Sequence, residues 1–370
     1  MPEARSAAPP RCLFVINDLA RAGAEKQASL LALGLRELGW SVSFVLIKER
    51  NDFADPLAAA SIPVAALHRR GPFDLGIVGR LRRAIAESSP DVVVSFLFLA
   101  NLLTVLASRS LKNRPKVVVS VRESYQRNHS AIHRLIARLA HRSADLTIVN
   151  SMSILREEEA GFPKTARIVH LPNAVVPRPE DPVPWPAFGA RGGGLVVSVG
   201  QLAPVKGHRI LIEAFASVAG ANPDVRLALV GAGPEEPGLR ALALARGVSD
   251  RVLFIGHQED PLPFMAAADL FVQPSLSEGM SNSLMEAMSL GRCIVATRVG
   301  AAPDVLEDEV HALLCPPTAA GLAAALNRAL GDPGLRHRLG EAARRRSRDF
   351  SIDRIAGELD ALLRDAVRRR

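Results

Sequence analysis

Two glutamates that flank a glycine-containing turn are the residues best placed to do chemistry. Glu278 and Glu286 stand eight positions apart in the stretch SLSEGMSNSLMEAM, which begins at Ser275. A predicted strand at Leu270–Gln273 precedes this stretch and a predicted helix follows it, so free backbone amides at the turn suit phosphate or sugar oxygens. The carboxylates can accept hydrogen bonds from the hydroxyls of a sugar or a ribose. A structural explanation is also open, because Ser275-x-x-Glu278 and Ser283-x-x-Glu286 both match a helix capping box.

A lysine at the entry of another helix is the second candidate. The stretch GQLAPVKGH begins at Gly200 and places Lys206 between a predicted strand and a predicted helix. A lysine in this position can pair with a phosphate whose other oxygens meet the helix amides. Taken alone, an exposed loop lysine is the simpler interpretation.

Short apolar strands that alternate with amphipathic helices must position these residues. Continuous apolar strands separated by helices predict a parallel sheet covered on both faces. In the first half, strands are predicted at Cys12–Ile16, Val42–Ile47, Val92–Phe96, Lys116–Val121 and Leu146–Val149, and helices at Gly23–Leu38, Ile77–Glu87, Leu99–Ala107, Ser130–His141 and Ser151–Glu159. In the second half, strands are predicted at Leu195–Val199, Val225–Val230, Val252–Ile255, Leu270–Gln273, Ile294–Thr297 and Ala312–Cys315, and helices at His208–Ala219, Leu239–Arg246, Ser283–Leu290 and Ala319–Leu330.

A segment rich in proline and glycine, Pro172 to Gly194, divides the two alternating regions. This composition indicates a domain boundary, and 370 residues suffice for two domains of ordinary size. The sequence therefore predicts an N-terminal Rossmann-like domain over 1–176, a linker over 177–194, a C-terminal Rossmann-like domain over 195–348 and a closing helix over 349–370. Two doubly wound α/β domains in tandem are expected to face a cleft at the carboxyl ends of their strands.

Charge and cysteine content narrow the class of partner. The net charge of +8 suits anionic small molecules or an anionic membrane surface, whereas an aromatic content of 4% disfavours nucleic acid. The three cysteines, Cys12, Cys293 and Cys315, lie in or beside apolar runs and form no Cys-x-x-Cys pair, which predicts buried thiols. The apolar run from Val92 to Ser108 falls short of a membrane span and is predicted to form a strand followed by a helix. With no apolar N-terminal leader, we expect a cytoplasmic protein that is peripheral on the inner face of the membrane.

The order of these motifs resembles that of the retaining glycosyltransferases of family 4, the glycogen-synthase-like enzymes with the GT-B fold. The resemblance extends through nearly the whole chain and is strongest from Val196 to Ala301. In that family the two motif glutamates are separated by seven residues, as Glu278 and Glu286 are here. The resemblance implies an enzyme of bacterial surface-polysaccharide or glycoconjugate synthesis.

The resemblance also assigns a role to each motif residue. It implies that Glu278 faces hydroxyls of the donor sugar and that Glu286 faces the ribose of the nucleotide. Lys206 matches the family's phosphate-binding lysine. The backbone amides of four residues of the turn would line the sugar and the diphosphate: Gly279, Met280, Ser281 and Asn282.

The chain departs from the family pattern at three places. Gln201 stands where an arginine usually precedes the lysine by five positions, so one diphosphate contact is weaker or comes from elsewhere, such as Arg209. In the first half, Gly23 lies in an Ala-Gly-Ala-Glu turn that resembles the family's Gly-Gly-Ala-Glu, whose backbone would approach the donor phosphates or the acceptor. Arg122 and Glu123 stand where many members carry histidine, and Arg122 either holds an acceptor phosphate or forms an ordinary surface ion pair.

The resemblance further implies the substrates. The expected donor is a nucleotide sugar, a UDP-linked hexose or N-acetylhexosamine, and the expected acceptor is a saccharide or a lipid-linked saccharide. The chain contains no Asp-x-Asp motif, so no metal ion and no other cofactor is expected. Positive side chains and helix N-termini would stabilise the leaving diphosphate. Two other functions stay open: a non-catalytic protein that binds a nucleotide sugar, which Gln201 favours, and a nucleotide-sugar epimerase.

Overall fold

The structure, a computed structural model, describes residues 8–71, 73–74, 76–122, 131–161, 167–177 and 194–369. These residues form two compact units. The first comprises Met1–Ala174 together with Ile352–Arg370, and the second comprises Val175–Ser351. The predicted linker over 177–194 lies, except for its two end residues, outside the described residues.

The first unit is built on a parallel sheet of seven strands in the order β3-β2-β1-β4-β5-β6-β7. The strands are β1 (Arg11–Ile16), β2 (Ser41–Leu46), β3 (Val64–Ala66), β4 (Val92–Phe96), β5 (Lys116–Val121), β6 (Leu146–Val149) and β7 (Ile168–His170). The helices are α1 (Gly23–Glu37), α2 (Ala54–Ala59), α3 (Gly76–Ser88), α4 (Phe98–Ser108), α6 (Ala131–Arg142), α7 (Met152–Gly161) and α15 (Ile352–Arg368). The strand order reverses between β1 and β4, which is the doubly wound arrangement.

Successive side chains of a strand point to opposite faces of the sheet, so they pack in two separate hydrophobic cores. On β1, Phe14 and Ile16 pack with the apolar stripes of α1 and α15, whereas Leu13 and Val15 pack with α3 and α4. Because the central strands β1, β4 and β5 are buried on both faces, they read as continuous apolar runs in the sequence. The apolar run that begins at Val92 is accordingly β4 followed by α4.

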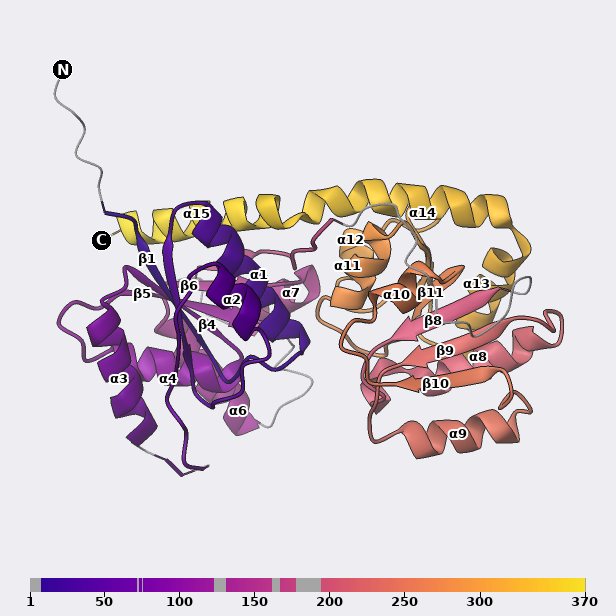
Figure 1. The fold of residues 1–370 in the computed structure, drawn as a ribbon, viewed down its shortest axis with the longest axis horizontal. Coiled ribbons are helices and arrows are strands. Elements are labelled where there is room, and N and C mark those ends of the chain that lie inside the picture. Colours follow the sequence, from indigo (N-terminus) through magenta and orange to yellow (C-terminus); the bar gives the residue numbers. More distant parts are fainter. Residues whose placement is uncertain are drawn as a thin grey trace, which may run out of the picture. The chain divides into compact units, whose positions relative to one another are not determined.

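The C-terminal helix α15 belongs to the first unit, although 177 residues of the second unit precede it. It lies beside α1, so close that a Cβ at Gly34 would come within 2.5 Å of the Cβ of Ala356 (Figure 1). Trp40 is fully buried, and its indole Nε1 donates a hydrogen bond of 2.6 Å to Oδ1 of Asp360 on α15. Burial of an apolar stripe and this hydrogen bond hold the helix in place.

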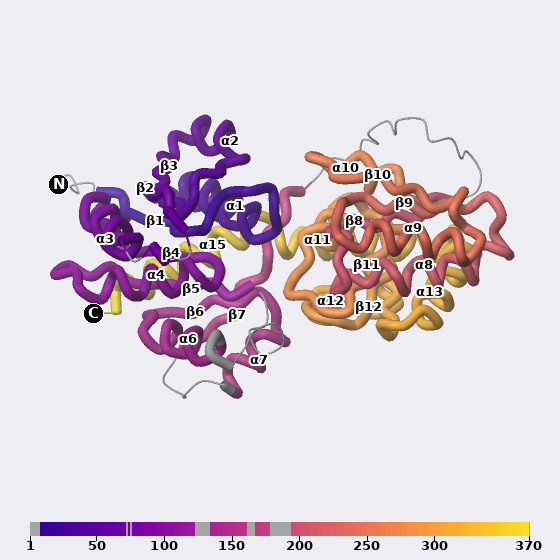
Figure 2. The backbone as a smooth tube through the Cα atoms, turned by 90° about the horizontal axis from the view of Figure 1, so that it is seen from below, coloured from indigo at the N-terminus to yellow at the C-terminus, as the bar shows by residue number. Residues whose placement is uncertain are grey.

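The second unit has a parallel sheet of six strands in the order β10-β9-β8-β11-β12-β13. The strands are β8 (Leu195–Val199), β9 (Arg226–Val230), β10 (Val252–Gly256), β11 (Leu270–Gln273), β12 (Cys293–Thr297) and β13 (Leu313–Cys315). The helices are α8 (His208–Ala219), α9 (Glu236–Ala245), α10 (Leu262–Ala266), α11 (Asn282–Ser289), α12 (Ala302–Val305), α13 (Ala319–Gly331) and α14 (Pro333–Ser347), with 3₁₀ turns η1 (Pro204–Lys206) and η2 (Arg348–Phe350). Figure 2 shows β10, β9, β8, β11 and β12 side by side in this order.

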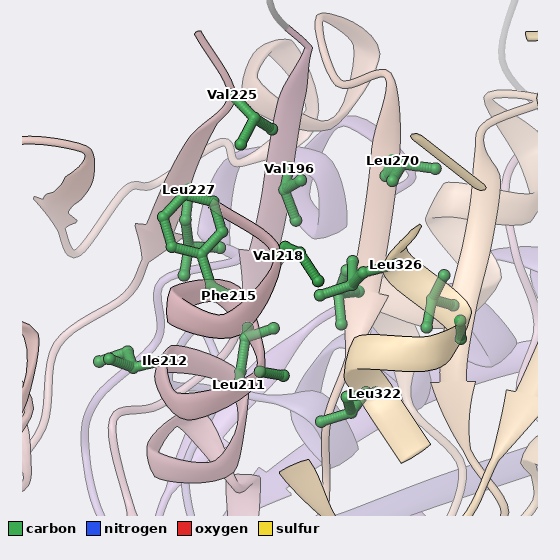
Figure 3. Packing of buried hydrophobic residues seen from close by; sticks show 14 of the residues in the cluster. Val196, Leu211, Ile212, Phe215, Val218, Val225, Leu227, Leu270, Leu322 and Leu326 are labelled. Carbon is green, nitrogen blue, oxygen red and sulfur yellow. The ribbon is translucent and has the colours of Figure 1, made fainter. Parts of the chain in front are cut away.

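Two helical layers cover this sheet. On one face, Leu211, Phe215 and Val218 of α8 pack against strand residues such as Val196 and against α13 (Figure 3). On the other face, residues of α10, α11, α12 and α14 pack against the alternate strand positions, for example Phe271. Helices on both faces force the connecting loops to the strand ends, so the carboxyl edge of the sheet is made of loops.

The predicted fold class is confirmed, since both units are doubly wound parallel α/β domains. The three cysteines are buried free thiols, as the sequence predicts. Burial raises the pKa of Cys293 to about 12 and that of Cys315 to about 11, so neither is a reactive thiolate at neutral pH. None of the helices in the described ranges is long and apolar enough to cross a bilayer.

Candidate active site

The strand order of the second unit singles out one place for a ligand. After β8 the chain turns to β9 on one side, and it later returns to β11 on the other side. Loops that leave two adjacent parallel strands in opposite directions open a crevice at their carboxyl ends. Here these loops are residues 200–207 after β8 and residues 274–281 after β11, which contain most of the predicted site residues.

Close backbone contacts join the two loops. Gly207 has a φ of 69°, and a Cβ at this position would lie 2.0 Å from the carbonyl oxygen of Pro274. The amide of Leu276 donates a hydrogen bond of 2.8 Å to the carbonyl of Val205. Only glycine allows both the left-handed backbone and this approach. Gly207 therefore brings Lys206 to the start of α8 and against the loop that follows β11.

Lys206 and Glu278, which are 72 positions apart in the sequence, form an ion pair in the structure. The distance from Lys206 Nζ to Glu278 Oε2 is 2.6 Å, and both side chains are half-buried. The hydroxyl of Ser275 donates a second hydrogen bond, of 3.2 Å, to the same carboxylate oxygen. The predicted phosphate-binding lysine and the predicted sugar-binding glutamate are thus already in contact.

The N-terminus of α11 completes this part of the site. Ser281 is its N-cap, because the Ser281 hydroxyl accepts a hydrogen bond of 3.3 Å from the amide of Leu284. Ser283 is therefore not the cap: its hydroxyl donates to the carbonyl of Val199 at 3.2 Å and ties α11 to the end of β8. The capping-box explanation of Ser283 and Glu286 is wrong for this reason. Asn282 is the first residue of the helix, so the amides of the first turn, which have no partner within the helix itself, lie at this end.

A third loop supports the glutamate turn from behind. Gly300 has a φ of 57°, and a Cβ there would lie 2.3 Å from the carbonyl oxygen of Glu278. The amide of Ala301 donates to the carbonyl of Gly279 at 2.8 Å. Thr297, at the end of β12, donates from its hydroxyl to the carbonyl of Ser275 at 2.6 Å. Gly300 is a site residue that the motif analysis missed, and its signal in the sequence is only a Val-Gly-Ala turn after a strand.

Glu286 and Met280 are mostly buried. Glu286 lies in the second turn of α11 with 8% of its surface exposed, and Met280 packs in the core beneath the glutamate turn. Gln201, by contrast, is exposed in the loop after β8. The guanidinium of Arg209, the suggested replacement for the missing arginine, lies beside Gly238 of α9.

Two further polar side chains are buried at this edge of the sheet, and neither was singled out from the sequence. His208, the first residue of α8, has 2% of its surface exposed, and its Nδ1 has no hydrogen-bond partner among the described residues. Burial, together with the charge of Lys206, lowers the pKa of His208 to about 4, so the imidazole is neutral at pH 7. Gln273, the last residue of β11, is also buried, and neither side-chain amide atom is hydrogen-bonded within the described part of the chain.

The candidate residues of the first unit lie at the carboxyl edge of its own sheet. Arg122 follows β5 and is half-buried; its Nε donates to Ser120 Oγ and its Nη1 to Asn173 Oδ1, both at 2.8 Å. Its guanidinium also lies over the ring of Phe96, 5.0 Å from the centroid. Burial lowers the pKa of Arg122 to about 10, so it stays charged at neutral pH. Among the described residues, the groups that hold this guanidinium are neutral, whereas Glu123, the next residue in the chain, lies outside the described residues.

Gly23 is the first residue of α1, exposed at the loop that follows β1. Glu25, two residues further on, is buried, and desolvation raises the pKa of its carboxyl. The turn thus lies at the carboxyl edge of β1, where a doubly wound sheet exposes helix amides. Within the described residues, no group of three or more His, Cys, Asp or Glu side chains is arranged to hold a metal ion.

Two family models match the chain at these two units. The model of the glycosyl transferase 4-like domain matches residues 22–174, and the model of glycosyl transferases group 1 matches residues 190–346. The fold, the order of the motifs and both family matches indicate the same family. The chain belongs to the group 1 glycosyltransferases of family 4, which have the GT-B fold.

Two relatives of the chain are glycosyltransferases by name. The lipopolysaccharide core biosynthesis glycosyltransferase LpsE of Rhizobium meliloti is 28% identical over 320 residues, which cover 86% of this chain and 88% of LpsE. The N-acetylgalactosamine-N,N'-diacetylbacillosaminyl-diphospho-undecaprenol 4-alpha-N-acetylgalactosaminyltransferase of Campylobacter jejuni is 27% identical over 281 residues, 72% of this chain and 74% of that enzyme.

A solved structure supports the fold. The structure of Anabaena Alr3699/HepE in complex with UDP-glucose superimposes with a TM-score of 0.84, covers 96% of this chain and 99% of that protein, and is 23% identical. This similarity confirms the predicted GT-B fold.

Proposed function

We propose that this glycosyltransferase transfers a hexose or N-acetylhexosamine from a UDP-linked donor, with retention at the anomeric carbon, to a saccharide or lipid-linked saccharide. The observation that carries the donor site is the junction of the loops after β8 and β11, where Lys206 meets Glu278 beside the N-terminus of α11. A cation, helix amides and a carboxylate in one place match the phosphates and hydroxyls of a nucleotide sugar. The UDP-glucose bound by the Anabaena protein supports the choice of nucleotide.

In this proposal the donor is held through its three parts. Lys206 and the amides of residues 279–282 bind the diphosphate, Glu278 accepts hydrogen bonds from sugar hydroxyls, and Glu286 accepts from the ribose. In the reaction, the bond between the anomeric carbon and the β-phosphate oxygen breaks, and a bond to the acceptor oxygen forms. The acceptor hydroxyl gives its proton to the departing phosphate. The cation and the amides stabilise the charge that develops there, with no metal ion in this scheme.

The acceptor side of the proposal rests on Arg122. In the described part of the chain its guanidinium is held by two neutral groups, Ser120 and Asn173, so a phosphate of a lipid-linked acceptor would supply an anionic partner. A surface helix gives the second support. On α6, Leu135 and Leu139 are 57% and 54% exposed, and they share this surface with the exposed Arg138 and Arg142. Exposed leucines among arginines suit the interface of an anionic bilayer.

The membrane part is tested by flotation with vesicles that contain anionic lipid. We expect the wild type to float at low salt and the double variant Leu135→Ser, Leu139→Ser to stay with the soluble fraction. Leu244→Ser is the matched control, because Leu244 is 70% exposed on α9 of the second unit. Equal flotation of both variants, or none for the wild type, would refute docking through α6.

The donor site is tested by thermal unfolding of the protein with UDP, GDP, ADP, TDP and CDP. A ligand at a hundredfold excess over its dissociation constant stabilises by about 2.7 kcal/mol. We expect UDP to raise the melting temperature and Lys206→Ala or Glu286→Ala to abolish the rise. Exposed Gln201 favours one alternative, a non-catalytic nucleotide-sugar binder. A shift with UDP but no sugar transfer to any lipid-linked saccharide would establish that alternative.

A further inference from the structure

The ion pair between Lys206 and Glu278 links the phosphate part of the proposed donor site to its sugar part. Glu278 Oε2 receives Lys206 Nζ at 2.6 Å and Ser275 Oγ at 3.2 Å, and the Glu278 side chain is only 15% exposed. Lys206 is 29% exposed. A carboxylate with so little access to water depends on these two donors, because hydrogen bonds to a charged group are stronger than those between neutral groups.

A bound diphosphate must compete with Glu278 for the lysine. When a phosphate draws Lys206 away, Glu278 keeps only Ser275 and gains an anionic neighbour, both of which are unfavourable. A nucleotide sugar offsets this cost, because its sugar hydroxyls donate to Glu278. A nucleoside diphosphate without sugar offers no such donor. The pair therefore lowers the affinity for the product, the nucleoside diphosphate, more than the affinity for the substrate, the nucleotide sugar.

We infer that the Lys206–Glu278 pair is a product-release device, which weakens binding of the free nucleoside diphosphate relative to the nucleotide sugar. This inference rests on the proposed function. Before transfer, the sugar occupies Glu278 and Lys206 is free for the phosphates. Once the sugar has moved to the acceptor, Glu278 loses the hydroxyls, attracts Lys206 again and loosens the diphosphate.

The geometry adds a second feature to the device. Gly207 and Gly300 fix the backbone on either side of the pair, since a Cβ at either position would come within 2.3 Å of a carbonyl oxygen of the loop that follows β11. The loops are thus held together by their backbones whether or not the ion pair is formed. Opening of the pair needs only side-chain rotation, which is fast compared with turnover.

The test is the affinity of the protein for UDP, measured by isothermal titration calorimetry with wild type and Glu278→Gln. Glutamine has nearly the same shape but no charge, so it releases Lys206 for the phosphates. We expect UDP to bind about tenfold more tightly to Glu278→Gln, equivalent to one charged hydrogen bond. UDP-glucose, which loses its charged acceptor, should gain no affinity, so the preference of the protein for donor over product falls.

Two control variants separate this device from a general effect of charge. Glu235→Gln removes a carboxylate from the same loop cluster, where the Glu235 amide donates to Leu202, and should change UDP affinity less than about twofold. Ser275→Ala removes the other donor to Glu278, so UDP should bind more weakly than to wild type. Retained melting temperatures show that each variant is folded.

The outcomes distinguish the inference from the proposed function. If none of UDP, GDP, ADP, TDP and CDP binds to the wild type, the proposed donor site itself is wrong. If one of them binds to the wild type and binds no more tightly to Glu278→Gln, or tightens equally in Glu235→Gln, the release device is overturned while the donor site stands. If the nucleoside diphosphate binds more tightly to Glu278→Gln and to no other variant, the result supports both the donor site and the release device.

Discussion

Replacement of His208 by glutamine should remove a specific part of the protein's sensitivity to acid. His208 is the first residue of α8, and only 2% of its surface is exposed. Burial and the adjacent charge of Lys206 lower its pKa from 6.5 to about 4. An unfolded chain binds a proton at His208 below pH 6.5, whereas the folded chain resists it until about pH 4. The stability that His208 contributes is therefore present above pH 6.5 and is lost as the pH falls toward 4.

The two pKa values set the size of the effect. Each pH unit between them costs about 1.36 kcal/mol, so a change from pH 7.5 to pH 5.0 destabilises the wild type by about 2 kcal/mol through this residue alone. Glutamine does not titrate, so His208→Gln lacks this loss whatever it costs at pH 7.5. The free energies of unfolding of the two proteins should consequently differ by about 2 kcal/mol less at pH 5.0 than at pH 7.5, because only the wild type has a titrating group at this position.

The assay is urea unfolding followed by circular dichroism at both pH values, with His257→Gln as the matched control. His257 is exposed after β10, so its replacement should leave the pH dependence of the wild type intact. A two-domain chain can unfold in two steps, and the transition that His208→Gln shifts is the one to compare. Equal acid sensitivity of wild type and His208→Gln would refute the claim that this imidazole is buried in its neutral form.

Two further predictions concern backbone and helix contacts. Gly207→Ala forces a Cβ to 2.0 Å from the carbonyl of Pro274 at a φ of 69°, so we expect a loss of about 2–4 kcal/mol in urea unfolding and no thermal shift with UDP. Asp360→Ala removes the acceptor of the Trp40 indole, so the first unit should lose about 1–2 kcal/mol. In a Trp185→Phe background, Trp40 is the only remaining tryptophan, and its emission should report that unfolding at lower urea than in the parent.

The central elements of both sheets and the edge strands β10 and β13 follow directly from the sequence, whereas the edge strands of the first sheet do not. The predicted bounds of Leu270–Gln273 and His208–Ala219 match β11 and α8, because deep burial gives these segments strong apolar patterns and the loops that flank them contain proline or glycine. The short strands β3 and β7 were missed. Each has three residues, none fully buried, at opposite edges of one sheet, so the apolar pattern is weak.

The helix α14 was missed for a different reason. Its sequence PGLRHRLGEAARRRS is strongly basic, and its contact with the core is made largely by small residues. A Cβ at Gly340 would lie 2.2 Å from the carbonyl of Gly291, which shows how closely the helix approaches the loop after α11. Contacts of this kind carry little hydrophobic periodicity, so a pattern of apolar residues cannot reveal them.

For the site, chemistry was predictable from the sequence and proximity was not. The residue types around Glu278 and Lys206 indicate sugar and phosphate binding, but nothing in a spacing of 72 positions predicts a 2.6 Å ion pair. That distance depends on the strand order, which makes β8 and β11 neighbours although β9 and β10 intervene in the sequence. His208 was missed because its functional property, a low pKa, arises from burial that only the folded chain provides.

The charges of the second unit explain why the pairing of Lys206 matters. Gln201 brings no charge to the loop after β8, His208 is neutral at pH 7, and the charge of Lys206 is already matched by Glu278. In the proposed donor site, a nucleoside diphosphate therefore meets a cation, Lys206, that must first be released from Glu278. Such a site gains most from a ligand that satisfies Glu278 at the same time as it binds Lys206. Specificity for the intact donor then follows from the pair itself, because no ligand without sugar hydroxyls can satisfy both residues.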